Sequence, residues 1–194
     1  LSVFVNTVGG NVLVNGGVAN GGAKVVTADI QASNGIIHVI DGVLKLPTIV
    51  DHIKANPSLS SLLGVVTSTS QAAVLTTLNN ATGSAPLTVY APDNGAFATA
   101  TATGGFLVGL SDAQVSNTLR YHVESTNRVA GSTSFSTSAD ISVTTLYTPF
   151  RFTILRSTLK INDAFGSPSA NVKTTNIQGT NGSVQIIDRV LRPM

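Results

Sequence analysis

The chain has 194 residues, of which 42% are hydrophobic and 10% charged, and it contains no cysteine and no tryptophan. These proportions are typical of a globular protein with a mostly aliphatic core, and they exclude intrinsic disorder, disulfide bonds and thiol catalysis. The net charge of +2 comes without a basic run, and no apolar stretch reaches the roughly 18–20 residues of a membrane span, so nucleic-acid binding and a transmembrane segment are not expected.

The first 47 residues predict strands without helices. Apolar and polar residues alternate in several short runs, and paired glycines at 9–10, 16–17 and 21–22 separate them. The spacing of these pairs does not fit a GxGxxG phosphate loop, so we expect turns. A sheet without covering helices exposes apolar surface and unpaired edges. We therefore expect this segment to pack on residues 48–194, to pair with strands of another chain, or to belong to a longer tandem protein.

Residues 48–122 predict a series of short helices interrupted by one strand. Capping-box patterns begin at Thr48 and Ser111, and Asn56 precedes Pro57 at another helix start. LTVYAP at 87–92 is typical of a strand closed by proline. The remaining expected helices cover 59–66, 71–80 and 94–100, and the one after Ser111 places Val115, Leu119 and His122 on one face.

Strand patterns follow Arg128. Residues 141–147 alternate, RFTIL and LKIND flank a turn at Ser157-Thr158, and 171–177 and 183–191 complete the expected sheet. Helices and strands are thus segregated along the chain, which favours an α+β fold.

One sequence motif occurs twice in similar form: NGIIHVIDGVL at 34–44 and NGSVQIIDRVL at 181–191. The match extends without gaps over residues 25–44 and 172–191, at an offset of 147 residues. That offset is far longer than the period of a solenoid and has the size of a whole domain. We therefore predict one complete domain at 48–194, preceded at 1–47 by the C-terminal part of another copy whose front part is missing.

Three motifs occur in an order that resembles the fasciclin (FAS1) family. They are LTVYAPDNGAF at 87–97, LRYHV at 119–123 and NGSVQIIDRVLRP at 181–193. The copy at 34–47, NGIIHVIDGVLKLP, resembles the last motif even more closely because it keeps His38. Gly95 and Gln185 depart from the family's usual acidic residue and histidine, and we expect both changes to remove polar cross-links between the motifs.

The resemblance implies an α+β fold in which a compact β-wedge or sandwich is flanked by a helical layer. It also implies an extracellular or cell-surface adhesion module, often present in tandem. The motif residues that it marks as structural are Asp41, Pro92, Asn94, Phe97, His122 and Asp188.

The Tyr-His motif leaves two interpretations open. The resemblance implies that Tyr121 and His122 contact a partner. The helical pattern instead favours a hydrogen-bonded core histidine beside a packing tyrosine with a satisfied hydroxyl.

The remaining polar residues suggest structural roles or modification. Asp41 and Asp188 lie in apolar strands, where a carboxylate is expected to accept hydrogen bonds and fix register, and Asp93 is expected to cap a helix. Asn80 and Asn181 stand in N-x-S/T sequons, which are glycosylation sites if the source is eukaryotic and secreted. The sequence shows no metal-ligand spacing, no nucleophile–base pair and no cofactor motif, so we expect no enzyme, no metal and no cofactor.

Three functions stay open. The first is a non-enzymatic adhesion module that binds a matrix protein, a glycan or another copy of itself. The second is a carrier of a small apolar ligand such as a carotenoid, which would purify with its pigment. The third is a self-assembling filament or sheath subunit, which would form homo-oligomers through residues 1–47 in a concentration-dependent way.

Overall fold

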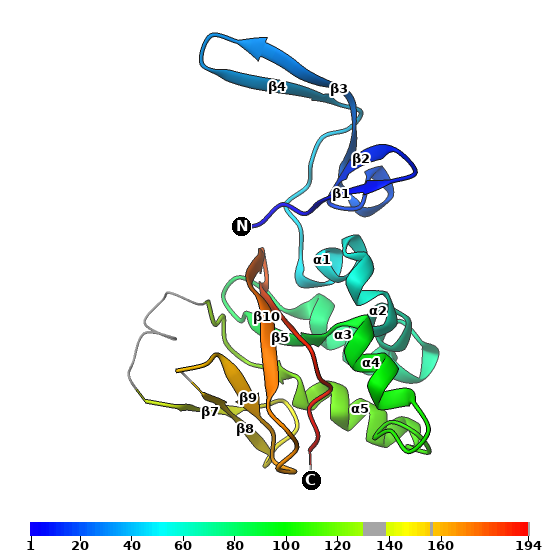
Figure 1. Cartoon of the computed structure of the whole chain (residues 1–194), viewed down its shortest axis with the longest axis vertical. Helices are drawn as coiled ribbons and strands as arrows, with labels where there is room; N and C mark the ends of the chain where they lie inside the picture. The colour runs from blue at the N-terminus through cyan, green and yellow to red at the C-terminus, as the bar shows by residue number, and fades with distance from the viewer. Residues whose placement is uncertain (130–138, 156, 194) are drawn as a thin grey trace.

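The computed structural model describes residues 1–129, 139–155 and 157–193, and it contains two separate sheets (Figure 1). A four-stranded sheet lies within residues 5–40, and a seven-stranded sheet lies within residues 87–187. Helices α1 to α5 pack as a layer against the second sheet. This is the α+β class that the sequence pattern predicts, and it has the β-wedge with a flanking helical layer that the family resemblance implies.

Helices α1, η2, α4 and α5 begin at residues whose side chains cap them, whereas α2 and α3 begin without a side-chain cap. Thr48 forms a capping box with Asp51, and Ser111 forms one with Gln114. The Asp93 carboxylate accepts a hydrogen bond from the first turn of α4, as expected. The layer comprises α1 (Ile49–Ala55), η2 (Pro57–Leu59), α2 (Ser60–Val66), η3 (Thr69–Gln71), α3 (Ala72–Asn80), α4 (Asn94–Thr101) and α5 (Asp112–Tyr121).

The seven-stranded sheet has the order β6-β5-β11-β10-β9-β8-β7. Its strands pair antiparallel except β5 and β11, which are parallel neighbours. A bridge between Glu124 and Thr145 joins the two edges, so the sheet curls into a wedge. The strands are β5 (Leu87–Pro92), β6 (Val123–Glu124), β7 (Ile141–Thr144), β8 (Arg151–Leu155), β9 (Lys160–Asn162), β10 (Ala170–Gly179) and β11 (Gly182–Ile187).

Three strands are shorter than the sequence predicts, and β9 lacks one residue at each end of LKIND. β7 ends at Thr144, the last residue that pairs with β8, because Thr145 instead forms a bridge with Glu124. β11 ends at Ile187 instead of Leu191, because the backbone N–H of Leu191 donates to an imidazole nitrogen of His122 and not to a neighbouring strand.

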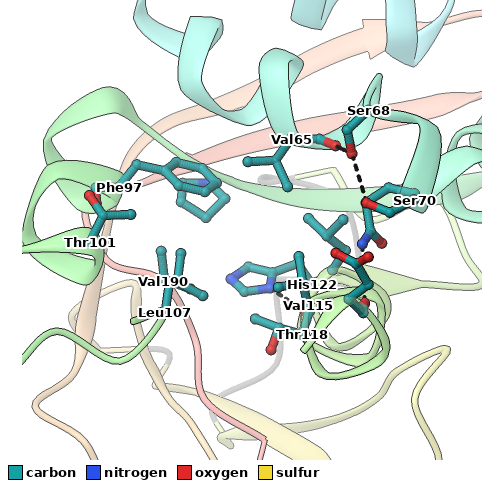
Figure 2. A pocket seen from close by; sticks show the side chains of 14 residues that line it. Val65, Ser68, Ser70, Phe97, Thr101, Leu107, Val115, Thr118, His122 and Val190 are labelled. Atoms are coloured by element: carbon teal, nitrogen blue, oxygen red, sulfur yellow. Dashed lines mark hydrogen bonds between the residues drawn. The ribbon is translucent and has the colours of Figure 1, made fainter. Parts of the chain in front are cut away.

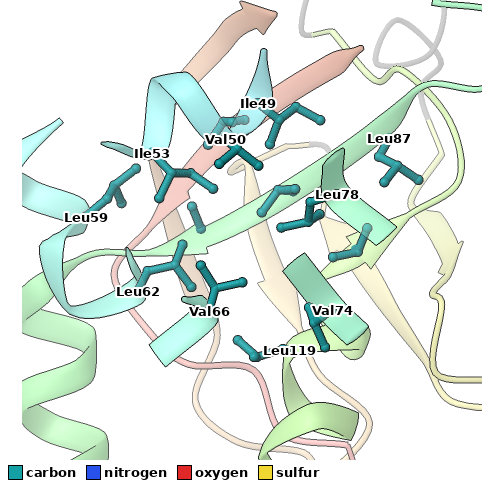
Figure 3. Close-up of a cluster of buried hydrophobic side chains, with 14 of the residues drawn as sticks. Ile49, Val50, Ile53, Leu59, Leu62, Val66, Val74, Leu78, Leu87 and Leu119 are labelled. Carbon is teal, nitrogen blue, oxygen red and sulfur yellow. The ribbon is translucent and has the colours of Figure 1, made fainter. Parts of the chain in front are cut away.

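The main hydrophobic core lies between the helical layer and one face of the sheet (Figure 3). Val184 and Ile186 of β11 face the helices there, while Ile187 belongs to a second cluster on the opposite face with Tyr90 and Phe152. Every residue of β11 is therefore buried. Burial of such side chains stabilises the fold by about 1.5–3 kcal/mol for each large apolar residue.

No single helix within the described ranges is long and apolar enough to cross a membrane. One pair of consecutive helical segments, bent by 77°, has the combined length and apolar composition of a membrane span: Pro57–Val66 and Thr69–Asn80.

The four-stranded sheet repeats the last four strands of the larger one. Its order is β1-β2-β3-β4, and β3 and β4 have the same bounds as β10 and β11 at an offset of 147 residues. The register is the same in both hairpins, including two bulges at equivalent places. The strands are β1 (Val5–Val8), β2 (Asn11–Val14), β3 (Ala23–Ala32) and β4 (Gly35–Ile40). The sequence repeat is thus also a structural repeat.

Local backbone conformation is repeated as well. Asp29 and Asn176 occupy equivalent bulges in the two hairpins. Both have the left-handed conformation that short polar residues tolerate, with φ of 59° and 64°. Gly9 and Gly10 form the predicted two-residue turn between β1 and β2, both with positive φ. The other two glycine pairs flank a short helix, η1 (Val18–Asn20), and do not form simple hairpin turns.

The two hairpins differ in burial. Ile37 and Val39 of β4 are 53% and 43% exposed, whereas their counterparts Val184 and Ile186 are 0% and 6% exposed. The cause is topological: within the described residues, β4 is an edge strand, and it has neither a parallel neighbour like β5 nor a helical layer against it.

Residues 1–47 contact the rest of the chain at their base. The Ser2 hydroxyl donates to the Asn176 carbonyl at 3.1 Å, and the side-chain amide of Asn20 donates to the Asp51 carbonyl at 2.9 Å. The backbone N–H of Thr180 donates to the Pro47 carbonyl. The β3–β4 hairpin projects away from these contacts (Figure 1), so packing on residues 48–194 covers the base of the segment and leaves its hairpin exposed.

Candidate functional site

A cavity of about 260 Å³ lies within the helical layer beside His122 (Figure 2). α2, α4 and α5 and the segment after β11 supply its walls, and Val65, Phe97, Leu107, Val115 and Val190 give it an apolar interior. Figure 2 shows Ser68 and Ser70 toward one end of the cavity. Asp112 lies beside them, because its backbone carbonyl accepts a hydrogen bond from the side-chain amide of the neighbouring Gln71. The volume is just below the roughly 300–1,000 Å³ of pockets for drug-sized ligands, so the cavity suits a small apolar group or one end of a longer molecule.

His122 forms part of the cavity wall but has no free nitrogen to offer a ligand. Its Nδ1 hydrogen-bonds the Thr118 carbonyl at 2.7 Å, and its Nε2 accepts the Leu191 N–H at 2.9 Å. Nδ1 therefore carries the proton. Burial lowers the pKa of His122 to about 4, so the ring is neutral at pH 7. Its observable role is to attach the C-terminal segment to α5.

Tyr121 is fully buried, and it therefore does not present its ring to a partner as the family resemblance implied. Its hydroxyl donates to the Arg151 carbonyl and accepts the Ala164 N–H, each at 2.8 Å. Burial raises the pKa of Tyr121 to about 12. His122 is likewise only 4% exposed, so the structure gives both residues the core environment of the alternative interpretation.

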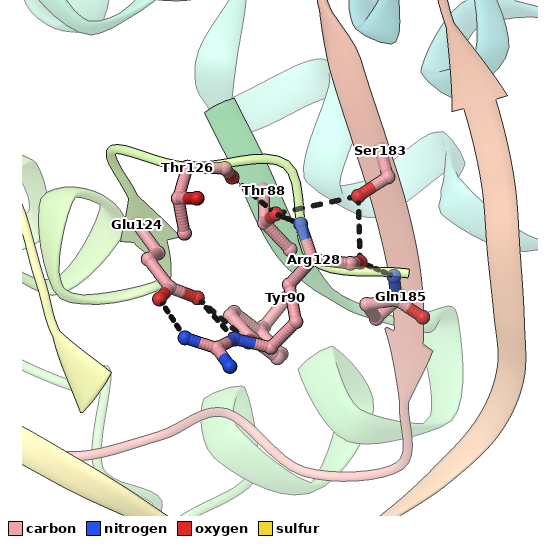
Figure 4. Close-up of polar contacts among 7 residues, drawn as sticks. All are labelled: Thr88, Tyr90, Glu124, Thr126, Arg128, Ser183 and Gln185. Carbon is pink, nitrogen blue, oxygen red and sulfur yellow. Dashed lines mark hydrogen bonds and ion pairs between the residues drawn. The ribbon is translucent and has the colours of Figure 1, made fainter. Parts of the chain in front are cut away.

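A buried polar network lies on the face of the seven-stranded sheet that points away from the helical layer (Figure 4). The Arg128 guanidinium makes a two-point contact with the Glu124 carboxylate, and the Tyr90 hydroxyl donates to the same carboxylate at 3.0 Å. The hydrogen bond with Glu124 raises the pKa of Arg128, and burial raises the pKa of Tyr90. Sequence reasoning missed this network, although an acid and a base four residues apart in a chain with few charges were a visible signal.

Gln185 strengthens this network, contrary to the expectation that it removes a cross-link. Its amide donates to the Arg128 carbonyl at 2.8 Å and accepts the Asn176 N–H at 3.0 Å. In the first hairpin His38 accepts the equivalent hydrogen bond from Asp29. Glutamine and histidine can replace each other here because each offers an acceptor at the same reach.

The other motif residues hold elements together. The Asn94 amide bonds the Ser61 N–H and the Pro57 carbonyl, which fastens the start of α4 to α2. Pro92 ends β5, and Phe97 packs in the main core and also borders the cavity.

Asp41 and Asp188 make the same backbone contact in the two hairpins. Asp188 accepts the Asn171 N–H, and Asp41 accepts the Lys24 N–H, both at 2.7 Å. Each carboxylate therefore fixes the end of its last strand against the preceding one.

The two sequons differ in accessibility. Asn80 is exposed at the end of α3. Asn181 is 3% exposed, and its amide accepts the Ile49 N–H and donates to the Leu78 carbonyl. A glycan on Asn181 would displace these buried contacts, so the structure rules out this site in the folded chain.

Comparison with known proteins decides the family. A fasciclin domain model matches residues 1–47 and 57–193. The chain belongs to the fasciclin family. A search of curated protein sequences finds no significant match.

The fold of this fasciclin chain is similar to a solved FAS1 domain pair from the insect cell adhesion molecule Fasciclin I. The TM-score is 0.64 at 20% identity, and the match covers 98% of this chain and 67% of the pair. Fasciclin domains are commonly adhesion modules, typically of extracellular or cell-surface proteins, and they are not enzymes as a family.

The fasciclin chain has no group of three or more histidine or acidic side chains that could hold a metal ion among the residues described. The buried polar groups at the Tyr-His motif and in the Arg128 network bond to one another or to the backbone. This arrangement positions strands and helices, and the cavity beside His122 offers shape and apolar contact for binding.

Proposed function

We propose that this fasciclin chain is a non-enzymatic adhesion and matrix-interaction module of an extracellular or cell-surface protein with fasciclin domains in tandem. The observation that supports it is the distribution of exposed apolar side chains. Of the 17 large ones among the described residues, 14 lie within residues 1–46. A concentration of exposed apolar side chains in one segment favours an interaction site there. The partner is a matrix protein, a glycan or another copy of the chain.

A bead-clustering assay tests the proposal. Beads coated with the chain are mixed with one another, with collagen-coated beads and with glycan-coated beads. The double variant Ile37→Thr and Val39→Thr keeps strand propensity but removes apolar contact area, and it should reduce clustering. Val108→Thr is the matched control, because Val108 is 56% exposed outside the hairpin. Equal clustering by all three proteins, or none by the unaltered chain, would contradict the proposal.

The cavity beside His122 favours a second function, a carrier of a small apolar ligand. Its apolar interior provides the driving force, and the polar end near Ser70 and Asp112 would orient a hydroxyl or amine. A pigment as long as a carotenoid would place one end in the cavity and leave the rest outside.

Ligand extraction tests the carrier function. Solvent extracts of the purified chain are examined by absorbance and mass spectrometry, and binding of the fluorophore N-phenyl-1-naphthylamine is titrated. Val115→Phe fills the cavity and should abolish the bound species, whereas Val108→Phe should not. Extracts without ligand, together with equal fluorophore binding by both variants, would exclude the carrier function.

A further inference from the structure

The β3–β4 hairpin has the sequence of a buried element in an exposed setting. Its counterpart β10–β11 has the same bounds and register and is covered along β11 on both faces. Positions 36–39, 43 and 44 of the first copy are exposed, whereas their counterparts at 183–186, 190 and 191 are buried. The repeat therefore predicts which structure would bury these residues: one like the segments that bury their counterparts on and after β11.

The free edge of β4, compared with β11, predicts the register in which an added strand would pair with it. In the seven-stranded sheet, β5 runs parallel to β11. Leu87 lies opposite Gly182, Val89 opposite Val184 and Ala91 opposite Ile186. At the offset of 147 residues, a strand like β5 would pair Val89 with Ile37 and Ala91 with Val39. A strand edge with unpaired N–H and C=O groups is a template for such an addition.

The exposed faces of β4 define the rest of the partner. Ile37 and Val39 correspond to the residues of β11 that pack on α1, α2 and α3. Val43, which is 92% exposed, corresponds to Val190, which packs against Ala96 and Ala100 of α4. A single β-strand cannot cover these positions; the helical layer is also required.

A second copy of residues 1–194 cannot supply this cover by exchange of hairpins. Each described chain holds two hairpins of this type and one helical layer with its β5 strand. Exchange of hairpins between copies therefore leaves one hairpin uncovered for every chain in the assembly, whatever its size. Covering β4 by exchange would uncover β11, which carries three large apolar residues of its own.

We infer that the β3–β4 hairpin is a docking site for the front half of a fasciclin domain, a helical layer followed by a parallel strand of the LTVYAP type. This inference names the partner of the surface on which the proposed function rests. The fold of the Fasciclin I pair is consistent with it, because about a third of that pair has no counterpart in this chain.

A fusion of residues 48–147 ahead of Leu1 provides the test, since residue 148 is the counterpart of residue 1. Hydrogen exchange is measured at the amides of 36–40 in the unaltered chain and in the fusion. Docking should slow exchange there by at least about tenfold, because opening would then require loss of packed structure. The control fusion carries Val89→Pro in the added segment, which removes an N–H from the centre of the strand.

Engineered disulfides test the register, because the chain has no cysteine of its own. Val39→Cys should form a disulfide with Ala91→Cys in the added segment and leave no free thiol. Val39→Cys with Val89→Cys, two residues out of register, should keep both thiols free. Unchanged exchange at 36–40, an added segment that stays unfolded, or equal cross-linking of both pairs would each overturn the inference.

The two proposals can fail separately. If the fusion docks, β4 is covered, and the fused chain should cluster beads no better than the variant with Ile37→Thr and Val39→Thr. If those substitutions reduce clustering but the fusion does not dock, the hairpin is an interaction surface for another partner, and the inference alone falls.

Discussion

At the scale of single residues, burial decides what the polar side chains of this protein do. His122 and Tyr121 belong to the motif that the family resemblance linked to partner contact, yet both are inside the fold and bonded to the backbone. Glu124 and Arg128 belong to no motif identified in the sequence, yet they form a largely buried ion pair. Polar groups in such places stabilise the fold only while every partner is present.

His122 should make stability depend on pH. Its pKa is lowered from 6.5 to about 4 in the folded state, so the unfolded chain binds more protons in this range. The free energy of unfolding should therefore fall by about 3 kcal/mol as the pH falls from 6.5 to 4. Urea unfolding of His122→Gln should show a smaller pH dependence, with a remainder from His52, whose pKa burial also lowers. A pH dependence equal to that of the unaltered chain would contradict this role.

Arg128→Met should destabilise the chain strongly, because it leaves the Glu124 carboxylate buried without its cation. The expected loss in the free energy of unfolding is about 3–5 kcal/mol, measured by urea denaturation. Lys173→Met is the control: Lys173 pairs with Asp93, but its side chain is 52% exposed, so its loss should matter far less. Similar losses for the two variants would show that burial of the pair is not the cause.

At the scale of elements, the two hairpins show how one sequence pattern behaves in two environments. Local rules fix the strand bounds, the bulges, the left-handed residue and the aspartate at the strand end, and these are the same in β3–β4 and β10–β11. Contacts with distant segments differ, and so does the role of equivalent residues.

Asn34 and Asn181 provide a matched test at this scale, since they are equivalent turn residues. Asn181→Ala would leave the Ile49 N–H and the Leu78 carbonyl without their buried partner, which should cost about 2–4 kcal/mol in the free energy of unfolding. Asn34→Ala removes an exposed side chain and should have little effect. Thermal and urea unfolding of both variants measure the difference, and equal costs would refute it.

At the scale of the whole molecule, the chain combines a covered domain with an uncovered repeat of its last strands. Backbone hydrogen bonds are alike in the two hairpins, but only β11 lies beneath a helical layer within the described chain. Hydrogen bonds alone do not resist local opening when little apolar surface is buried with them.

Amide exchange in the unaltered chain should therefore be much faster in β3–β4 than in β10–β11. Mass spectrometry of peptides that cover residues 25–40 and 172–187 compares strands of the same register. We expect protection of the second hairpin to approach the free energy of global unfolding, and that of the first to be far lower. Equal protection would mean that the first hairpin is covered in solution.

Sequence patterns alone predict the α+β class, most helix and strand positions and the repeated hairpin, and three motifs indicate the family that the comparison confirms. Capping boxes, alternation and turn glycines act over a few residues, so they are visible in a single sequence. Four features are visible only in the folded chain: Tyr121 is buried, Asn181 has a structural role, Gln185 cross-links segments, and β4 is exposed while β11 is buried. Those outcomes depend on which distant segments meet, and residues up to 132 apart supply the deciding contacts.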